Sequence, residues 1–144
     1  SLKEELLGLI DADTNAYNDV LDAYRMSRVT KNQVSLRNKT LAKAMKKASK
    51  IPFKTLQICN QVIDYAKEAV ECGNSNSITD AGVAAEMANA GAKGASFNVK
   101  INLNEIDDDE YCKKMHKETD NLVKNTEDTL AIIRIIVSKN INCE

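Results

Sequence analysis

Asp13 is the residue of this chain whose type and position most clearly suggest chemistry. It lies within a stripe whose members recur every three or four residues, as on one face of a helix: Leu2, Leu6, Leu9, Asp13, Tyr17, Val20 and Tyr24. A carboxylate on an apolar helix face loses hydration, and this favours its protonated form. Such a group can act as a general acid or base near neutral pH. The alternative is a buried aspartate that caps a neighbouring helix or pairs with a lysine.

A polar loop at residues 73–77 holds a second group of candidates. Its backbone N–H groups could hold an anion at the start of the helix that follows. The amides of Asn74 and Asn76 could instead contact a polar ring, with Asp80 in the next turn. The alternative is a simple turn between helices, in which Ser77 and Asp80 form a variant of the capping box.

The segment after this loop is unusually rich in alanine and glycine. One helical face of it carries Ala84, Ala88, Gly91, Ala95, Asn98 and Asn102. Glycine inside a helix lowers stability, so we expect another backbone or a flat ligand to approach closely. The amides of Asn98 and Asn102 suit the polar edge of a pterin or a purine. The alternatives are tight helix packing and hydrogen bonds within the bundle.

The overall composition excludes several classes of protein. The chain has 20 Lys and Arg residues and 21 Asp and Glu residues. It therefore lacks the basic excess of a general nucleic-acid binder. No apolar run is long enough to span a membrane, and we recognise no leader sequence. The chain has one histidine and no C-x-x-C pair among Cys59, Cys72, Cys112 and Cys143. We therefore expect no metal site, reduced cysteines and a cytoplasmic location.

Few glycines, one proline and the apolar periodicity predict an all-α bundle of about five helices. The proline suits the first turn of a helix, and Gly73 suits the residue after a helix end. The alternating pattern at residues 97–103 resembles a strand, but a lone strand has no partner, so this segment is expected to be helical. The predicted helices cover Leu2 to about Arg25, Lys31–Ser49, Pro52 to about residue 72, Ile78 to about Leu103, and a last helix opened by the acidic turn at residues 107–110.

Four sequence segments occur together and in order. They are Leu9-Ile-Asp-Ala-Asp13 followed by Ala16-Tyr17, the Ile51-Pro52 junction, Gly73-Asn-Ser-Asn-Ser-Ile-Thr-Asp-Ala-Gly-Val-Ala-Ala85, and Phe97-Asn-Val-Lys-Ile-Asn-Leu103. In this combination the chain resembles the formiminotetrahydrofolate cyclodeaminase / methenyltetrahydrofolate cyclohydrolase family over nearly its whole length.

The resemblance implies an all-helical domain that forms a homodimer. It implies an enzyme that acts on a tetrahydrofolate derivative, with no other cofactor, no nucleic acid and no membrane partner. The second aspartate of the Asp-Ala-Asp motif is catalytic in this family, and it matches Asp13. On charge and spacing we expect the other substrate-binding residues to be Asn98 and Asn102 at the pterin or the reacting carbon, Asn74, Asn76 and Asp80 at the opposite wall, and Arg25 with the lysines of the linker that follows it at the glutamate tail.

Family members usually carry further N-terminal helices with a Pro-Gly-Gly-Gly-Ser-like motif. The resemblance therefore implies that residues 1–144 correspond to the C-terminal part of the domain. No residue separates a cyclodeaminase from a cyclohydrolase. A non-catalytic helical dimer or scaffold is the alternative from another class, and a carboxylate buried without a partner would argue against it.

Overall fold

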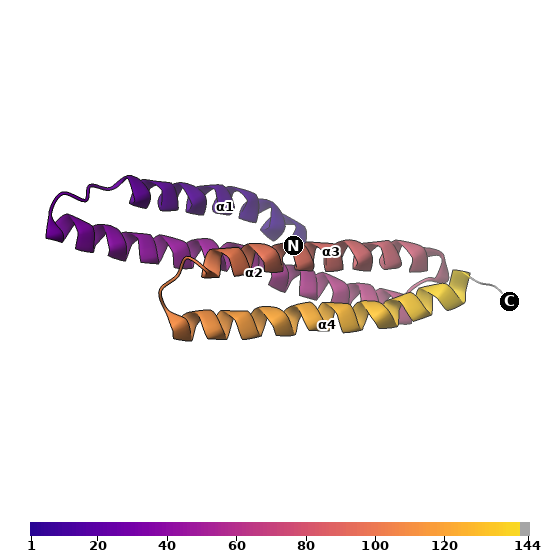
Figure 1. The fold of residues 1–144 in the computed structure, drawn as a ribbon. Coiled ribbons are helices and arrows are strands. Elements are labelled where there is room, and N and C mark those ends of the chain that lie inside the picture. The colour runs from indigo at the N-terminus through magenta and orange to yellow at the C-terminus, as the bar shows by residue number, and fades with distance from the viewer. Residues whose placement is uncertain (142–144) are drawn as a thin grey trace.

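The computed structural model describes residues 1–141, except for the side chain of Ser75. Those residues form four helices and a short 3-10 turn (Figure 1): α1 (Leu2–Arg25), α2 (Lys31–Cys72), η1 (Ser75–Ser77), α3 (Ile78–Leu103) and α4 (Asp109–Ile141). The all-α prediction is confirmed, and residues 97–103 are helical as expected. The prediction of about five helices is wrong, because the predicted second and third helices are one.

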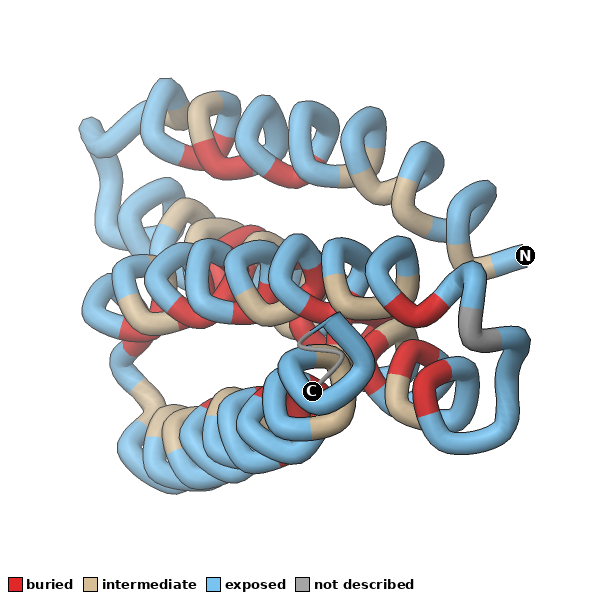
Figure 2. The backbone as a smooth tube through the Cα atoms, turned by 90° about the vertical axis from the view of Figure 1, so that its right-hand side faces the viewer, coloured by how far each residue is buried: buried red, intermediate tan, exposed pale blue. Residues whose placement is uncertain are grey.

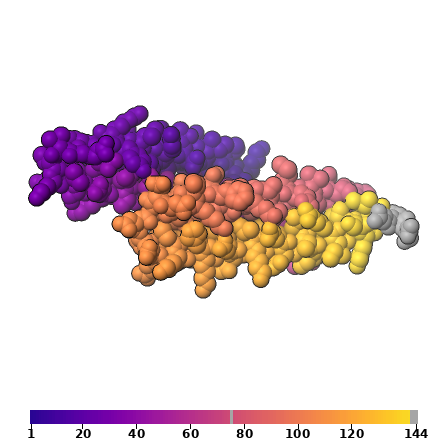
Figure 3. All heavy atoms as spheres, in the orientation of Figure 1, coloured from indigo at the N-terminus to yellow at the C-terminus, as the bar shows by residue number. Residues whose placement is uncertain are grey.

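The longest helix, α2, is the element on which the others pack. α1 lies along the N-terminal half and the middle of α2, where Glu5 pairs with Lys54, whereas α3 and α4 lie along its middle and C-terminal half and on each other (Figure 1). The molecule is therefore elongated, with α1 and the start of α2 at one end (Figure 3).

Local side-chain bonds set where the helices begin. Ser1 and Glu4 form a capping box at α1, and Thr30 and Gln33 form one at α2. The capping box predicted for Ser77 and Asp80 is not formed, since Ser77 makes no side-chain capping bond.

The turn before α3 is organised by Asn74 instead. Its side-chain oxygen accepts a hydrogen bond from the N–H of Asn76 at 3.0 Å, and its carbonyl accepts one from the N–H of Ser77 at 2.9 Å. Gly73 ends α2 as predicted, in an extended rather than left-handed conformation. A Cβ atom there would lie 2.1 Å from the carbonyl oxygen of Ala69, so the close approach requires glycine.

Pro52 lies inside α2 rather than in the first turn of a new helix. The prediction followed from local chemistry, since proline has no N–H to donate within a helix. The apolar face nevertheless runs through the proline without a break: Ala44, Met45, Leu56 and Ile58 are all buried. Burial on both sides of Pro52 stabilises a single continuous helix.

Small residues on α3 permit close packing against its neighbours. A Cβ atom added to Gly91 would lie 3.0 Å from the Sγ of Cys59 on α2, and one added to Gly82 would lie 3.0 Å from a methyl carbon of Val137 on α4. These contacts favour tight helix packing as the reason for these two glycines. Figure 2 shows that the buried positions of the helices face one another, whereas the outward sides of α1 and α3 are exposed.

The outward side of α3 carries an apolar row that we call the outer stripe: Val83, Met87, Ala90, Gly94, Phe97 and Ile101. The four large side chains are 62–69% exposed. The intervals alternate between four and three residues, which is the spacing of a helix that packs against a partner helix. A row of this kind is therefore suited to a contact beyond the single chain.

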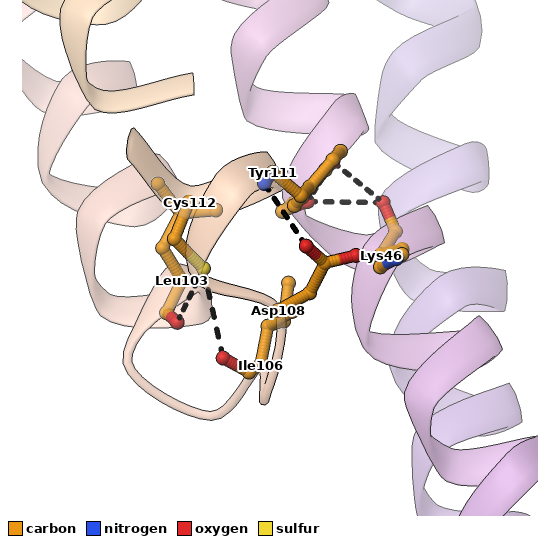
Figure 4. Close-up of polar contacts among 7 residues, drawn as sticks. Lys46, Leu103, Ile106, Asp108, Tyr111 and Cys112 are labelled. Atoms are coloured by element: carbon orange, nitrogen blue, oxygen red, sulfur yellow. Dashed lines mark hydrogen bonds and ion pairs between the residues drawn. The ribbon is translucent and has the colours of Figure 1, made fainter. Parts of the chain in front are cut away.

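Four polar residues, which we call the polar clamp, join the start of α4 to the middle of α2: Lys46, Ser49, Asp108 and Tyr111. One carboxylate oxygen of Asp108 accepts from the N–H of Tyr111 at 3.0 Å, and the other accepts from the Lys46 ammonium at 2.5 Å (Figure 4). The Tyr111 hydroxyl lies 2.8 Å from the Oγ of buried Ser49. The hydrogen bond from Lys46 lowers the pKa of Asp108, and the same bond raises the pKa of Lys46.

We expect the Asp108 carboxylate to stabilise the fold in a pH-dependent way. Its pKa is lower in the folded chain, so its contribution is present above the unfolded value of about 3.9 and is lost as the pH falls through the folded value. Asp108→Asn keeps a helix cap and removes the charge. The urea midpoint of this variant should lie below that of the wild type at about pH 7, with the gap closing towards about pH 2.5.

The neighbouring exposed Asp107 supplies the matched control. Asp107→Asn should leave the midpoint close to that of the wild type at both pH values. A gap for Asp108→Asn that stays constant with pH would show that the ion pair with Lys46 does not contribute.

Candidate functional site

The side chain of Asp13 lines a hollow at the junction of three helices, which we call the Asp13 hollow. Its volume is about 260 Å³, and its walls are Leu6, Leu9, Ile10 and Asp13 of α1, Ile51, Pro52 and Thr55 of α2, and Ala95 and Asn98 of α3. The hollow is largely apolar, with one carboxylate and one amide among its walls. An acid–base group and an amide at the edge of an apolar surface are the parts that a flat, polar-edged ring requires.

Asp13 is exposed in the single chain, so the prediction that it is buried is wrong for that chain. The buried face of α1 is rotated away from the predicted stripe: Ala16 and Ala23 are 1% exposed, whereas Tyr17 is 62% exposed. Small alanines allow α1 to approach α2 closely, and this leaves Asp13 at the edge of the contact. Its predicted catalytic role stays a prediction.

Asn98 and Asn102 were predicted to act together, but the structure separates their surroundings. Asn98 is exposed and lines the Asp13 hollow. Asn102 is partly buried, and its amide donates a hydrogen bond to the carbonyl oxygen of Ala48 at 3.1 Å. Only Asn98 therefore stands where it can share a ligand with Asp13 in the single chain.

The other predicted wall residues lie at the far end of α3. Asn74, Asn76 and Asp80 are all exposed at the turn that precedes this helix. From Asp80 to Asn98 the helix rises by about 27 Å. The single chain does not bring these three residues to the Asp13 hollow, and their predicted roles stay predictions.

A second hollow, of about 910 Å³, lies further along the contact between α1 and α2, and we call it the lysine hollow. Lys43, Lys46, Lys47 and Lys50 line it together with Asp19 and Asp22. Lys47 pairs with Asp19 at 2.6 Å. Which lysines of α2 face α1 depends on how the two helices pack.

Arg25 lines neither the Asp13 hollow nor the lysine hollow. It is exposed and pairs with Asp22 at 3.4 Å on the last turn of α1. From Asp13 to Arg25 the helix rises by about 18 Å. The neighbours of Arg25, Ala23 and Met26, line the lysine hollow, so Arg25 lies beside the far end of that hollow, and a ligand that reached it from Asp13 would have to be extended.

Thr55 is a wall residue that the sequence analysis missed. It is partly buried on α2, one turn beyond Ile51, and its hydroxyl donates to the Ile51 carbonyl at 3.3 Å. No local signal marks it, because its place in the hollow depends on the continuation of α2 through Pro52.

The described residues contain no group of three His, Cys, Asp or Glu side chains placed to hold a metal ion. Cys59, Cys72 and Cys112 are free thiols, and burial raises the pKa of Cys59. The remaining cysteine, Cys143, lies outside the described residues. Within residues 1–141, no helix is both long and apolar enough to cross a bilayer.

Comparisons with known proteins identify related sequences. The family model for formiminotransferase-cyclodeaminase matches residues 1–121. The methenyltetrahydrofolate cyclohydrolase of Methylorubrum extorquens is 34% identical over 122 residues, which cover 85% of this chain and 59% of that protein. The formimidoyltransferase-cyclodeaminase of Mus musculus is 30% identical over 129 residues, or 90% of this chain and 24% of that protein. The chain thus spans less than two thirds of the length of these relatives.

A solved structure has the same fold. It is the formiminotetrahydrofolate cyclodeaminase of Thermotoga maritima, which matches 97% of this chain and 66% of its own with a TM-score of 0.84 and 23% identity. The family match covers most of the chain and confirms the resemblance seen in the Asp-Ala-Asp and Asn-Val-Lys-Ile-Asn-Leu motifs. This chain belongs to the formiminotransferase-cyclodeaminase family.

Proposed function

We propose that the protein is an enzyme of folate one-carbon metabolism that acts on the carbon between N5 and N10 of tetrahydrofolate. The observation that carries the proposal is the meeting of Asp13 and Asn98 in one hollow, in a chain that belongs to this family. Asp13 is the acid–base group, and Asn98 orients the pterin edge through its amide. Family membership also argues against a purely structural role.

The first candidate reaction is cyclisation of 5-formiminotetrahydrofolate. N10 attacks the formimino carbon, a five-membered ring closes, and the C–N bond to the leaving nitrogen breaks. N10 loses a proton and the leaving nitrogen gains one, so the products are 5,10-methenyltetrahydrofolate and ammonia. One carboxyl group beside both nitrogens can accept the first proton and donate the second. We assign this transfer to Asp13.

The second candidate is hydrolysis of 5,10-methenyltetrahydrofolate, which the name of the Methylorubrum relative favours. Water adds to the methenyl carbon and loses one proton, and its second proton passes to N5 as the bond from that carbon to N5 breaks, which gives 10-formyltetrahydrofolate. Asp13 would accept the proton of the attacking water. Both reactions use an electrophilic carbon between the same two nitrogens, so one site serves either.

The outer stripe supports a homodimer. The chain exposes 9373 Å², whereas a compact monomer of 15.9 kDa exposes about 7,400 Å². The excess is larger than the roughly 800 Å² that each partner contributes to a standard interface. We infer that α3 pairs with α3 of a second copy, with Ala90 and Gly94 at the centre, where small residues permit close approach.

An antiparallel pair of this kind would also bring the predicted wall residues nearer to the site. Position 80 of one copy would then lie opposite position 104 of the other. Asp80 of the second copy, at the end of this turn, would be separated from Asn98 by about 9 Å along the helix axis, compared with about 27 Å within one chain. This supports the proposal that Asn74, Asn76 and Asp80 act across the dimer.

The lysine hollow is suited to the glutamate tail of the folate. It adjoins the Asp13 hollow along the same contact between α1 and α2, and four lysines and two aspartates line it. A tail of carboxylates leaving the pterin along this contact would meet Lys50 first and Lys43 further on. Arg25 lies near the far end and would contact only a longer tail.

The proposed role of Asp13 can be tested directly. Because Asp13 is exposed, Asp13→Asn should leave the fold intact and lower kcat by about 10²- to 10⁴-fold, the usual size of a lost acid–base contribution. Methenyltetrahydrofolate would be followed by absorbance, starting from the formimino and from the methenyl compound in parallel. Ammonia release with methenyl formation identifies a cyclodeaminase, and faster methenyl decay alone identifies a cyclohydrolase.

Asp11→Asn is the matched control, since Asp11 is an exposed aspartate of the same helix that does not line the Asp13 hollow. Its turnover should equal that of the wild type. Equal turnover of the Asp13→Asn protein would refute the acid–base assignment. No turnover by the wild type on either compound would favour the scaffold alternative.

The tail assignment predicts a loss that depends on tail length. Lys43→Gln with Lys50→Gln should weaken binding of a pentaglutamate folate about three- to tenfold, since exposed ion pairs contribute little each. Binding of the monoglutamate should change far less, and added salt should reduce the difference. Lys39→Gln, on the same helix outside the lysine hollow, serves as the control. An equal loss for both ligands would contradict the assignment.

The dimer assignment predicts that a charge on the outer stripe separates the copies. Sedimentation should give the wild type twice the chain mass and Phe97→Lys a single chain mass, because burying an unpaired ammonium is unfavourable. Val29→Lys is the control, since Val29 is an apolar residue outside the stripe that is 88% exposed. A monomeric wild type would overturn the assignment.

A further inference from the structure

The middle of α2 has a carbonyl group that lacks its regular main-chain donor. In a regular helix the N–H of each residue donates to the carbonyl four residues earlier. Position 52 is a proline without an N–H, so the carbonyl of Ala48 loses its main-chain donor. Pro52 is buried and Ala48 is partly buried, and a carbonyl left without a partner in such a place is costly.

A side chain from α3 supplies the missing donor. The amide nitrogen of Asn102 lies 3.1 Å from the carbonyl oxygen of Ala48, which is 54 residues away in the sequence. The carbonyl of Lys46 is also supported, by the Ser49 hydroxyl at 2.9 Å and the Tyr111 hydroxyl at 3.5 Å. The turns before Pro52 are thus held by side chains from both α3 and α4.

The residues just beyond these turns are the α2 wall of the Asp13 hollow, namely Ile51, Pro52 and Thr55. Their position relative to Asp13 depends on how α2 passes through the proline, because a proline inside a helix tends to kink it. The same α3 helix carries Asn98 into the hollow one turn before Asn102. One helix therefore both lines the hollow and holds its opposite wall.

We infer that Asn102 is a positioning residue: its amide takes the place of the N–H that Pro52 lacks, and it thereby fixes the α2 wall of the Asp13 hollow. Asn102 acts on the ligand only through Ala48 and the wall, unlike Asn98. The inference that Asn102 replaces the missing donor depends only on the observed hydrogen bond. The expected effect of Asn102 on turnover also rests on the proposed function.

A double-mutant cycle with Pro52→Ala tests this inference. In the native background, Asn102→Ala should lower the folding equilibrium constant about five- to a hundredfold, because it leaves the Ala48 carbonyl without a partner. In the Pro52→Ala background the new N–H at position 52 can donate to this carbonyl. The same Asn102→Ala change should then cost less than about twofold. Urea unfolding at one fixed protein concentration measures both values.

Two further variants isolate the donor. Asn102→Asp keeps the size of the side chain and removes the amide N–H, so it should show the same dependence on Pro52. Asn98→Ala, one turn earlier on α3, should have the same effect in both backgrounds. An equal loss from Asn102→Ala with Pro52 and with Ala at position 52, or no loss in either, would overturn the inference.

Hydrogen exchange and turnover report on the position of the α2 wall. Amide hydrogen exchange over residues 50–56 should quicken in Asn102→Ala and return close to the parent rate when Pro52→Ala is added. In the folded enzymes, Asn102→Ala should lower kcat/KM about tenfold when Pro52 is present, and less than about twofold in the Pro52→Ala background.

A loss of kcat/KM of the same size in both backgrounds would mean that Asn102 contacts substrate, and it would overturn the positioning role. Unchanged exchange and turnover, despite a stability loss that depends on Pro52, would also overturn it. An absence of turnover in every variant would refute the proposed function alone, since the unfolding and exchange measurements use no substrate.

Discussion

The whole fold depends on one long helix that continues through a proline. Pro52 removes a main-chain donor from the middle of α2, which is 42 residues long and carries the other three helices of the described chain. Asn102 and Tyr111 reach the carbonyls of the preceding turns from α3 and α4. The contact that supplies the missing donor therefore also joins α2 to α3, and the Tyr111 contact joins it to α4.

The helix α3 is apolar on two sides, and the two sides have different roles. Its inner side packs alanines against α2, and Gly91 allows the Sγ of Cys59 to come close. Its outer side presents the large side chains of the outer stripe to solvent. A helix that is apolar on opposite sides is typical of one that is covered on both. The described chain covers only one side, and this supports the proposal that a second copy packs against the other.

Much of the fold follows from the sequence, because periodic apolar patterns are local. The extents of α1 and α3 and the acidic start of α4 were predicted within a residue or two. The division of α2 at Pro52 was wrong, since the rule against proline in a helix is local and the donor that relieves it comes from Asn102. No local pattern states which distant side chain will meet a free carbonyl.

The site was predicted less completely for the same reason. The spacing places Asn98 and Asn102 on one face of α3, one helical turn apart. Asn98 lines the Asp13 hollow, whereas Asn102 donates a hydrogen bond to Ala48. The stripe on α1 was assigned to the core with Asp13 inside it. The alanines at positions 16 and 23 rotate the buried face, so that aspartate lies at its edge. Contacts between elements decided each outcome.

The exposure of Asp13 bears on how the proposed chemistry would work. Sites for small molecules usually measure about 300–1,000 Å³, whereas the Asp13 hollow measures about 260 Å³ and is open to water. Leu6, Leu9 and Ile51 already form apolar walls on one side of the carboxylate. A bound pterin ring, with the second copy across the outer stripe, would close the other side and remove water from Asp13. The sequence suggested that the carboxylate is always desolvated. In this arrangement it would lose its water only when the substrate is bound, which is when the proton is transferred.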